Sequence, residues 1–408
     1  METNIVSWFT DARFGLFVHW GIYAAAARHE WVKSYERLSD EHYQRYFDHF
    51  DPDLYDPERW ADQAVRAGMK YMVVTTKHHD GFCLWDSALT DYKARTDLLA
   101  PMLDAFRARG LRVGLYYSLL DWHHPDFPND LYHPQREEDL GERDVQKYAD
   151  YLHGQVRELL TGYGRIDTMW FDFSYAGRGF GAKGPQEWRS EELEKLVREL
   201  QPDILLNNRL GLGRGDFSTP EQVIPPGGLP GAGLWEACQT LNGSWGYHRD
   251  NLAWKPVELL IGMLVDTVSK GGNMLLNVGP NARGEFEPRA VERLDGIAEW
   301  MRLHGRAIHG AGASPYTPPQ DCRYTQRGDR LYLHLLAWPL KHLFLPGLAG
   351  KVRYAQLLND ASEVPIVTID PKEPFHHYLK GVPEDTLVLE LPAVRPEVTV
   401  PVIEMFLT

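Results

Sequence analysis

The sequence predicts an α/β fold: a (β/α)₈ barrel over residues 1–312, followed by a small antiparallel β-sandwich over residues 313–408. Short apolar runs of strand length alternate with helical patterns over roughly the first 310 residues, which is typical of a parallel sheet buried on both faces. Six or seven such units suit a closed barrel better than a doubly wound sheet. A doubly wound nucleotide-binding sheet would also need a Gly-x-Gly-x-x-Gly turn after its first strand, and none is present.

Strand-like and helix-like segments alternate in order along the barrel region. The strand-like runs are short and nearly continuously apolar, as strands buried on both faces are. They are Phe14–Gly21, Met69–His79, Leu111–Pro125, Ile166–Ser174, Pro202–Arg209, Leu234–Thr240 and Gly271–Pro280. The helix-like segments between and after them are amphipathic or strongly charged. They are Leu98–Gly110, Glu142–Thr161, Pro185–Gln201, Trp254–Lys270 and Glu287–Gly305.

The pattern changes near Ser314. Two strand-like runs flank a turn at Gly328 and Asp329, and further strand-like runs follow without a convincing helix between them, which predicts the small β-domain. One Pro/Gly-rich segment, Ile224–Gly233, interrupts the barrel region. It is interpreted as a loop, either a plain connector or a mobile lid over a site.

Composition argues against several functional classes. The net charge of −14 disfavours a general nucleic-acid binder, which needs a basic face. The three cysteines, Cys83, Cys238 and Cys322, are far apart and odd in number, so no disulfide framework or zinc knuckle follows. No apolar run reaches the roughly 18 residues that span a bilayer, and the chain starts without a signal-peptide pattern. We therefore expect a cytoplasmic protein that has no membrane partner.

Polar and aromatic residues end five of the predicted strands. Catalytic groups of barrels lie at the carboxyl ends of the strands, because all of these ends meet on one face. A single polar strand end is unremarkable, but five that converge on one rim predict a pocket. The five groups are His19-Trp20-Gly21, His78-His79-Asp80, the set Tyr117, Asp121, Trp122, His123 and His124, Trp170-Phe171-Asp172, and Asn207-Asn208-Arg209.

Asp172 is the first candidate for chemistry. It ends a strand on the same side as Trp170 and lies between Phe171 and Phe173, where a carboxylate is unusual without a task. The alternative is structural, since strand-end aspartates also cap helices or pair with arginine. The residues alone leave both interpretations open.

Glycoside hydrolysis would need a second carboxyl group beside such an aspartate. Three glutamates near the predicted rim qualify: Glu30, Glu221 and Glu236. Each is explained equally well as a solvated loop residue or, for Glu236, as a strand residue paired with arginine. The residues alone do not choose among them.

His78 and His79 are adjacent in sequence. On a regular strand, neighbours point to opposite faces, so this pair lacks the His-x-His spacing that places two metal ligands on one face. Imidazoles donate and accept hydrogen bonds in fixed directions, which suits the hydroxyl groups of a neutral polyol. We therefore favour hydroxyl binding. The alternative function is a metal-dependent barrel hydrolase that uses His78, His79, His123 and His124.

Seven motifs occur in order between about residue 7 and residue 310: RFGLFVHWG, KHHDGFCLWDS, YYSLLDW, WFD, NNR, WEACQTLNGSWGY and SKGGNMLLNVGP. Together they resemble the α-L-fucosidases of glycoside hydrolase family 29. The resemblance implies a retaining exo-glycosidase that removes terminal α-L-fucosyl residues from oligosaccharides or glycoconjugates through a covalent intermediate. We expect no metal and no other cofactor. The implied partner is a fucosylated oligosaccharide, and homo-oligomers are compatible with it because members of the family often assemble.

The resemblance also implies roles for individual residues. Asp172 corresponds to the nucleophile that forms a fucosyl–enzyme ester. The acid/base glutamate changes position within the family. The segment DFSTPE matches a bacterial form of its motif, so Glu221 is preferred and Glu236 is the alternate. The sugar-binding positions fall on His19, Glu30, Trp31, His78, His79, Tyr117, Trp170 and Arg209.

Overall fold

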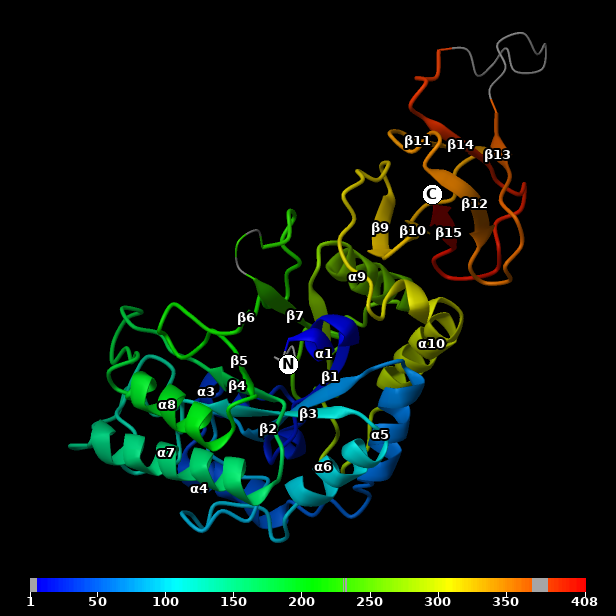
Figure 1. Cartoon of the computed structure of the whole chain (residues 1–408). Coiled ribbons are helices and arrows are strands. Elements are labelled where there is room, and N and C mark those ends of the chain that lie inside the picture. Colours follow the sequence, from blue (N-terminus) through cyan, green and yellow to red (C-terminus); the bar gives the residue numbers. More distant parts are fainter. Residues whose placement is uncertain (1–5, 230, 232, 369–380) are drawn as a thin grey trace.

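The computed structural model describes residues 6–229, 231, 233–368 and 381–408. Figure 1 shows a large barrel, built from the first three quarters of the chain, and a smaller all-β part at the C-terminal end. Helices α9 (Val257–Ser269) and α10 (Pro288–His304) lie between the two parts, and α9 packs on the first strand of the smaller one.

The barrel consists of eight parallel strands in the spatial order β5-β4-β3-β2-β1-β8-β7-β6. They are β1 (Phe14–Val18), β2 (Tyr71–Lys77), β3 (Arg112–Ser118), β4 (Thr168–Asp172), β5 (Leu205–Leu206), β6 (Phe217–Ser218), β7 (Leu234–Thr240) and β8 (Asn273–Val278). A parallel bridge between Asn207 and Phe217 joins the two edge strands and closes the circle. The predicted barrel is confirmed.

Helices cover most of the outer face of the barrel. The five predicted helices are present, each within a few residues of its expected ends: α6 (Leu99–Ala108), α7 (Val145–Gly162), α8 (Ser190–Leu200), α9 and α10. The sequence pattern missed five others: α1 (Ser7–Ala12), α2 (Tyr23–Ala26), α3 (Val32–Tyr35), α4 (Asp40–His49) and α5 (Pro57–Arg66). Side-chain caps start α4, α5 and α7, where Ser39, Asp56 and Asp144 accept backbone N–H groups.

The helical ring is incomplete beside β5 and β6. In the described residues, no helix follows either of these two-residue strands, and loops connect them to β7. The Pro/Gly-rich segment Ile224–Gly233 belongs to this region, but Pro230 and Ala232 lie outside the described residues, so its expected role as a lid stays a prediction. Within residues 207–229, the only regular element is β6, and loops make up the rest of this side of the barrel.

Large side chains fill the barrel interior. The cluster inside includes Phe17, Tyr71, Tyr116, Trp170 and Cys238, all almost fully buried. They come from five different strands, so they pack in layers across the barrel axis and leave no channel. The top layer, at the carboxyl ends of the strands, forms the floor of a pocket.

The C-terminal part has two antiparallel sheets, in the orders β12-β15-β10-β9 and β11-β14-β13. Its strands are β9 (Cys322–Arg327), β10 (Arg330–Leu335), β11 (His342–Leu345), β12 (Val352–Leu357), β13 (Ile366–Val367), β14 (Leu387–Glu390) and β15 (Val402–Leu407). Their apolar side chains form a separate core, as in a β-sandwich. The predicted boundary after residue 312 falls in the connection between α10 and β9.

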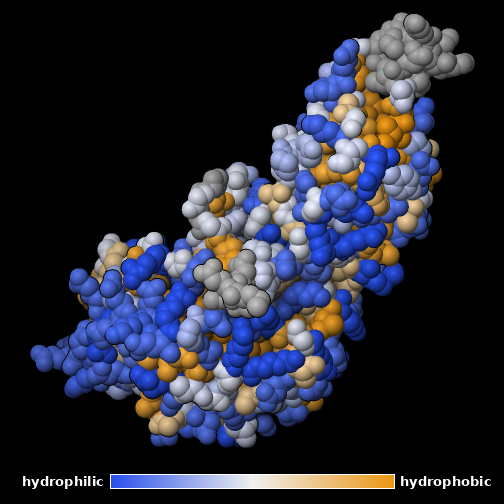
Figure 2. Space-filling view, viewed as in Figure 1, coloured by the Kyte–Doolittle hydropathy of each residue, from blue (hydrophilic) through white to orange (hydrophobic). Residues whose placement is uncertain are grey.

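The surface of the barrel in the view of Figure 2 is mostly hydrophilic, and hydrophobic residues gather at the C-terminal end of the molecule. Among the described residues, every helix is too short or too polar to cross a lipid bilayer.

Candidate active site

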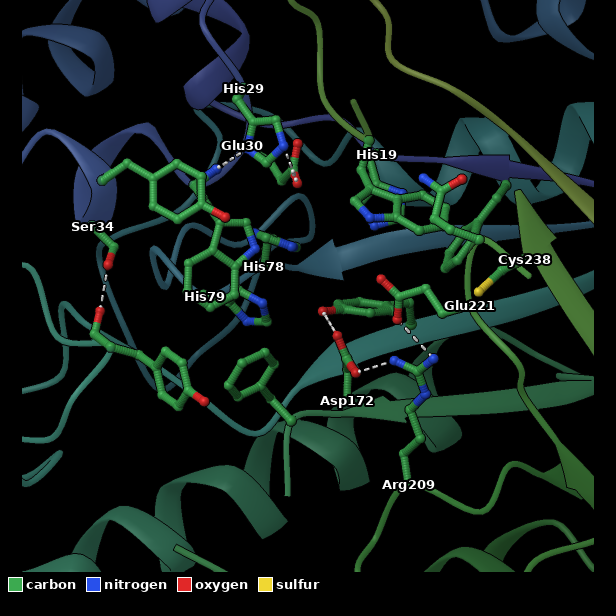
Figure 3. A pocket seen from close by; sticks show the side chains of 18 of the residues that line it. His19, His29, Glu30, Ser34, His78, His79, Asp172, Arg209, Glu221 and Cys238 are labelled. Carbon is green, nitrogen blue, oxygen red and sulfur yellow. Dashed lines mark hydrogen bonds and ion pairs between the residues drawn. The ribbon is translucent and has the colours of Figure 1, made fainter. Parts of the chain in front are cut away.

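A pocket of about 610 Å³ opens at the carboxyl ends of the barrel strands. Residues that follow five different strands line it, as the sequence pattern predicts (Figure 3). The lining contains nine of the eleven residues with predicted roles: His19, Glu30, Trp31, His78, His79, Trp170, Asp172, Arg209 and Glu221. The two that do not line it are Tyr117 and Glu236.

Asp172 is the last residue of β4 and points into the pocket. Its Oδ2 accepts a hydrogen bond from the Tyr116 hydroxyl at 2.8 Å, and its Oδ1 accepts one from Arg209 Nη1 at 2.7 Å. Burial raises the pKa of the Asp172 carboxyl, but the guanidinium and the hydrogen bonds outweigh burial and bring it below its usual value. Asp172 is therefore an ionised carboxylate that is held in one orientation.

Arg209 connects Asp172 to Glu221. Its Nη2 lies 2.9 Å from Glu221 Oε2, while Nη1 binds Asp172 (Figure 3). Thr219 accepts from Arg209 Nε at 2.8 Å, and the guanidinium stacks 4.5 Å above the Trp170 ring. One guanidinium thus places two carboxylates side by side, one from the end of β4 and one from the segment that follows β6.

Glu236, the alternate acid/base candidate, lies below the pocket. It is 1% exposed and accepts hydrogen bonds from Trp170 Nε1 at 3.0 Å and from the Tyr71 hydroxyl, so both of its oxygens have partners. Burial raises its pKa to about 7. On β7, Glu236 and Cys238 share the inward face, but Cys238 is nearer the carboxyl end and lines the pocket, whereas Glu236 is one layer deeper. A raised pKa alone does not make it the proton donor.

Hydrogen bonds fix the tautomers of His19 and His79. Asn277 donates to the Trp245 carbonyl through Nδ2, so its Oδ1 accepts from His19 Nδ1 at 2.6 Å.

Ser118 gives its only proton to the Leu120 carbonyl, so its Oγ accepts from His79 Nδ1 at 2.6 Å. Burial lowers the pKa of His19 to about 3 and that of His79 to about 4. Both rings are neutral, and each offers Nε2 as an acceptor for a hydroxyl group.

His78 and His79 both line the pocket, with ring centroids 3.9 Å apart. The alternation of a regular strand does not apply to them, because β2 ends at Lys77 and the chain turns at Gly81, which has a φ of 84°. His78 Nδ1 is buried without a hydrogen-bond partner, and burial lowers the pKa of the ring well below its usual value. It is a further neutral group available to a hydroxyl.

The four histidines of the metal-dependent alternative do not come together. His123 stacks on Tyr92 at 3.6 Å between centroids, and His124 contacts Tyr151, so neither lines the pocket. Within the described residues, no group of three or more potential ligands has the geometry to hold a metal ion. The arrangement therefore does not supply the ligand set that this alternative requires.

Glu30 is fully buried at the pocket edge. It accepts the Gly246 N–H at 2.7 Å, and its Oε1 lies 3.3 Å from His29 Nε2. The Trp31 N–H donates to His29 Nδ1, so His29 Nε2 carries the proton, and Glu30 Oε1 is buried without a hydrogen-bond partner. Burial raises the pKa of Glu30 to about 7. Trp31 beside it forms an apolar wall with Phe173, at 5.2 Å between ring centroids.

Tyr117 is the one predicted sugar-binding residue that faces away from the pocket. Its hydroxyl donates to Gln155 on α7, and Tyr116 takes the pocket position instead. The strand register explains this placement: Tyr116 is paired with Trp170 on β4, and Tyr117 with Phe171. Side chains at paired positions of neighbouring strands face the same side, so Tyr116 joins Trp170 inside the barrel.

Sequence reasoning also missed pocket residues on connecting segments. His29, Tyr132, Phe173 and Trp245 are among them. Trp245 lies 5.1 Å from His19 between ring centroids and belongs to the quoted motif WEACQTLNGSWGY, which is the only signal that pointed to it. Tyr132 lies in a long loop where no strand end marks it.

We expect Ser118→Ala to raise KM about 3- to 10-fold, because His79 loses the acceptor that fixes its tautomer. The effect on kcat should be smaller. The matched control is Thr325→Val, which deletes a hydroxyl that accepts from His334 Nε2 at 2.9 Å in the β-sandwich. Both variants should lower the melting temperature, but only Ser118→Ala should change KM. An unchanged KM for Ser118→Ala would contradict the assigned tautomer.

The free energy of unfolding should decrease as the pH drops from about 6.5 to 5. Histidines whose pKa is depressed by burial stay neutral in the fold but bind protons when unfolded, so their stabilisation is lost as pH falls from 6.5 towards their folded values. Carboxyl groups with raised pKa act in the opposite direction and lose stabilisation as pH rises. The histidines are more numerous: His19 and His334 at about 3, and His29, His79, His133, His304 and His309 at about 4. The opposing groups are Asp80 at about 6 and Glu30 and Glu236 at about 7.

Thermal unfolding at the two pH values measures this linkage. Each fully linked proton changes the free energy of unfolding by about 1.4 kcal/mol per pH unit. A melting temperature that is equal or higher at the lower pH would contradict the neutral state of the buried imidazoles.

Comparison with known proteins agrees with the geometry. The α-L-fucosidase family model matches residues 1–306. Tissue α-L-fucosidase from Rattus norvegicus is 32% identical over 369 residues, which cover 81% of this chain and 76% of the relative. The structure of α-L-fucosidase isoenzyme 1 from Paenibacillus thiaminolyticus is 46% identical, superposes with a TM-score of 0.92 and covers 99% of both chains.

A structure from Bacteroides thetaiotaomicron bears on the chemistry. It is a family 29 α-L-fucosidase trapped as a covalent intermediate with 2-fluoro-fucosyl fluoride, and it is 26% identical to this chain. It superposes with a TM-score of 0.86 and covers 100% of this chain and 97% of its own. Barrel, pocket and sequence therefore lead to the same conclusion: the chain belongs to the α-L-fucosidase family of glycoside hydrolases.

Proposed function

We propose that this α-L-fucosidase uses Asp172 as its nucleophile and Glu221 as its acid/base, and that its natural substrates are fucosylated oligosaccharides. The observation that carries the assignment is the Arg209 bridge between these two carboxylates at the pocket floor. Retaining glycosidases hold their two carboxyl groups about 5–5.5 Å apart. Two carboxylates on neighbouring nitrogens of one guanidinium suit this short separation.

The reaction proceeds in two displacements. Asp172 attacks the anomeric carbon while the glycosidic C–O bond breaks and Glu221 gives its proton to the departing oxygen. A fucosyl–Asp172 ester remains. Glu221 then takes a proton from water, the water oxygen attacks the anomeric carbon, and the ester bond breaks to regenerate Asp172.

The pocket is suited to hold the sugar during these steps. His19 and His79 offer neutral acceptors, Glu30 offers a carboxyl group, and all three are buried. Trp31 and Phe173 supply an apolar wall, which suits the methyl group that fucose carries at C5. Directional acceptors on one side and aromatic rings on the other would orient the ring over Asp172.

Two measurements test the assignment. Proton NMR at early times should show α-L-fucose as the first product, because two inversions restore the starting configuration. Incubation with 2-fluoro-fucosyl fluoride, followed by proteolysis and mass spectrometry, should place the added mass on the peptide that contains Asp172. First formation of β-L-fucose, or a label on another residue, would overturn the proposal.

A further inference from the structure

A second cavity of about 420 Å³ adjoins the pocket. We call it the side cavity; its own lining consists of Ser174, Tyr175, Arg178, Asn208, Gly211 and Thr219. The two spaces share Asp172, Phe173, Arg209 and Glu221. The volume of the side cavity falls within the range of about 300–1,000 Å³ that small-molecule sites occupy.

The shared residues place the reacting bond at the boundary of the two spaces. Asp172 must reach the anomeric carbon and Glu221 must reach the glycosidic oxygen, and both side chains line both cavities. The fucosyl ring belongs on the side of the buried imidazoles. The leaving group, which is attached through the glycosidic oxygen, would therefore lie next to the side cavity.

We propose that the side cavity is the subsite for the leaving group, and that it takes a hydroxyl-rich ring, namely a second sugar residue. This inference rests on the proposed roles of Asp172 and Glu221. Contacts in the side cavity would let the enzyme distinguish one leaving group from another, which contacts in the fucose pocket cannot do.

The side cavity has the donors and acceptors that a sugar needs. Thr219 Oγ1 accepts from Arg209 Nε and gives its proton to Asn208 Oδ1 at 3.2 Å, so the Asn208 amide nitrogen can still donate to a ligand. Arg178 adds an exposed guanidinium at the rim. Ser174 Oγ is buried without a hydrogen-bond partner, and rotation about its Cα–Cβ bond can offer it to a ligand.

The backbone at the end of β4 separates the two linings. Phe173 has a φ of 76°, in the left-handed region that residues other than glycine rarely adopt. Phe173 contacts Trp31 and His79 in the fucose pocket, while Ser174 next to it packs against Gly211 in the side cavity. A Cβ at Gly211 would lie 2.4 Å from Ser174 Oγ, so a larger residue would intrude on the cavity.

The other exit from the pocket has a different chemistry. At that mouth, Tyr35 is 66% exposed and Leu131 is 48% exposed, and Arg136 is the charged side chain near them, so a leaving group there would meet a less polar surface than the side cavity offers. Substitutions on the two sides can therefore distinguish the two routes.

The experiment compares two substrates in purified full-length variants. In α-L-fucosyl fluoride the leaving group is one atom and does not reach either exit, whereas an α-L-fucosyl-N-acetylglucosamine disaccharide, tested in each linkage, does. The measured quantity is kcat/KM for the best disaccharide divided by kcat/KM for the fluoride. Ser174→Leu, which fills the side cavity, and Arg178→Met, an exposed substitution, should each lower this ratio about tenfold.

The matched variants are Tyr35→Ala and Leu131→Ala at the other mouth, and they should leave the ratio unchanged. A ratio that stays constant in both Ser174→Leu and Arg178→Met, or that falls instead in Tyr35→Ala or Leu131→Ala, overturns the subsite. Arg178→Met keeps the test decisive if Ser174→Leu fails to fold. Failure of the proposed function looks different: the wild-type enzyme would then release β-L-fucose first, or 2-fluoro-fucosyl fluoride would label a residue other than Asp172.

Discussion

Replacing Asp172 by glycine is expected to lower kcat for an aryl α-L-fucoside by about 10⁴- to 10⁶-fold, the range seen when a catalytic nucleophile is removed. Asp172 supplies the atom that bonds to the anomeric carbon. Hydrogen bonds from Tyr116 and Arg209 hold its carboxylate in place. The fold should survive, because Arg209 keeps its contacts with Glu221 and Thr219. Steady-state kinetics and circular dichroism measure the two effects.

Azide adds a stereochemical test of the same variant. Glycine leaves room beside the anomeric carbon, so azide can attack directly from the nucleophile's side in one inversion and give β-L-fucosyl azide. The matched control is Asp167→Asn, just before the start of β4, where Asp167 pairs with Arg112 at 2.6 Å. It should lower the melting temperature and leave kcat near the wild-type value. Near-wild-type activity of Asp172→Gly would refute the assignment.

The strand ends explain why so much of the site could be predicted from the sequence. The carboxyl ends of all parallel barrel strands lie at one rim. His19, Asp172 and Arg209 therefore line the same pocket although they are far apart in the chain. Alternation along β4 correctly placed Asp172 and Trp170 on one side. These inferences depend only on local periodicity, which the sequence contains.

Local periodicity does not decide where the remaining residues lie. Tyr116 and Tyr117 are chemically identical, and only the register of β3 against β4 assigns one of them to the barrel interior. His78 and His79 lie just beyond the end of β2, so strand alternation no longer applies to them. Glu236 is on the inward face, but its depth along the barrel axis depends on how β7 is staggered against its neighbours. Strand register and stagger are properties of the assembled sheet, so the pattern along one strand does not reveal them.

Replacing Glu221 by alanine is expected to lower kcat/KM by about 10²- to 10⁴-fold for a fucosyl disaccharide, because general acid–base catalysis contributes a factor of this size. For a dinitrophenyl fucoside the first step should be nearly unaffected, since this leaving group needs no proton. Hydrolysis of the ester then becomes the slow step, because no base activates water. Rapid-quench kinetics should show a burst of dinitrophenol followed by a slow steady state.

Azide distinguishes Glu221 from the other candidate, Glu236. Azide needs no general base, so in Glu221→Ala it should attack the fucosyl–Asp172 ester, accelerate turnover and give α-L-fucosyl azide, the opposite anomer to the product of Asp172→Gly. Glu236→Ala leaves the Trp170 indole N–H and the Tyr71 hydroxyl without their buried acceptor, at about 1–3 kcal/mol each. It should therefore lower the melting temperature and show no azide rescue. Rescue in Glu236→Ala but not in Glu221→Ala would reverse the assignment, because only the residue that handles the proton can be bypassed by a nucleophile that needs none.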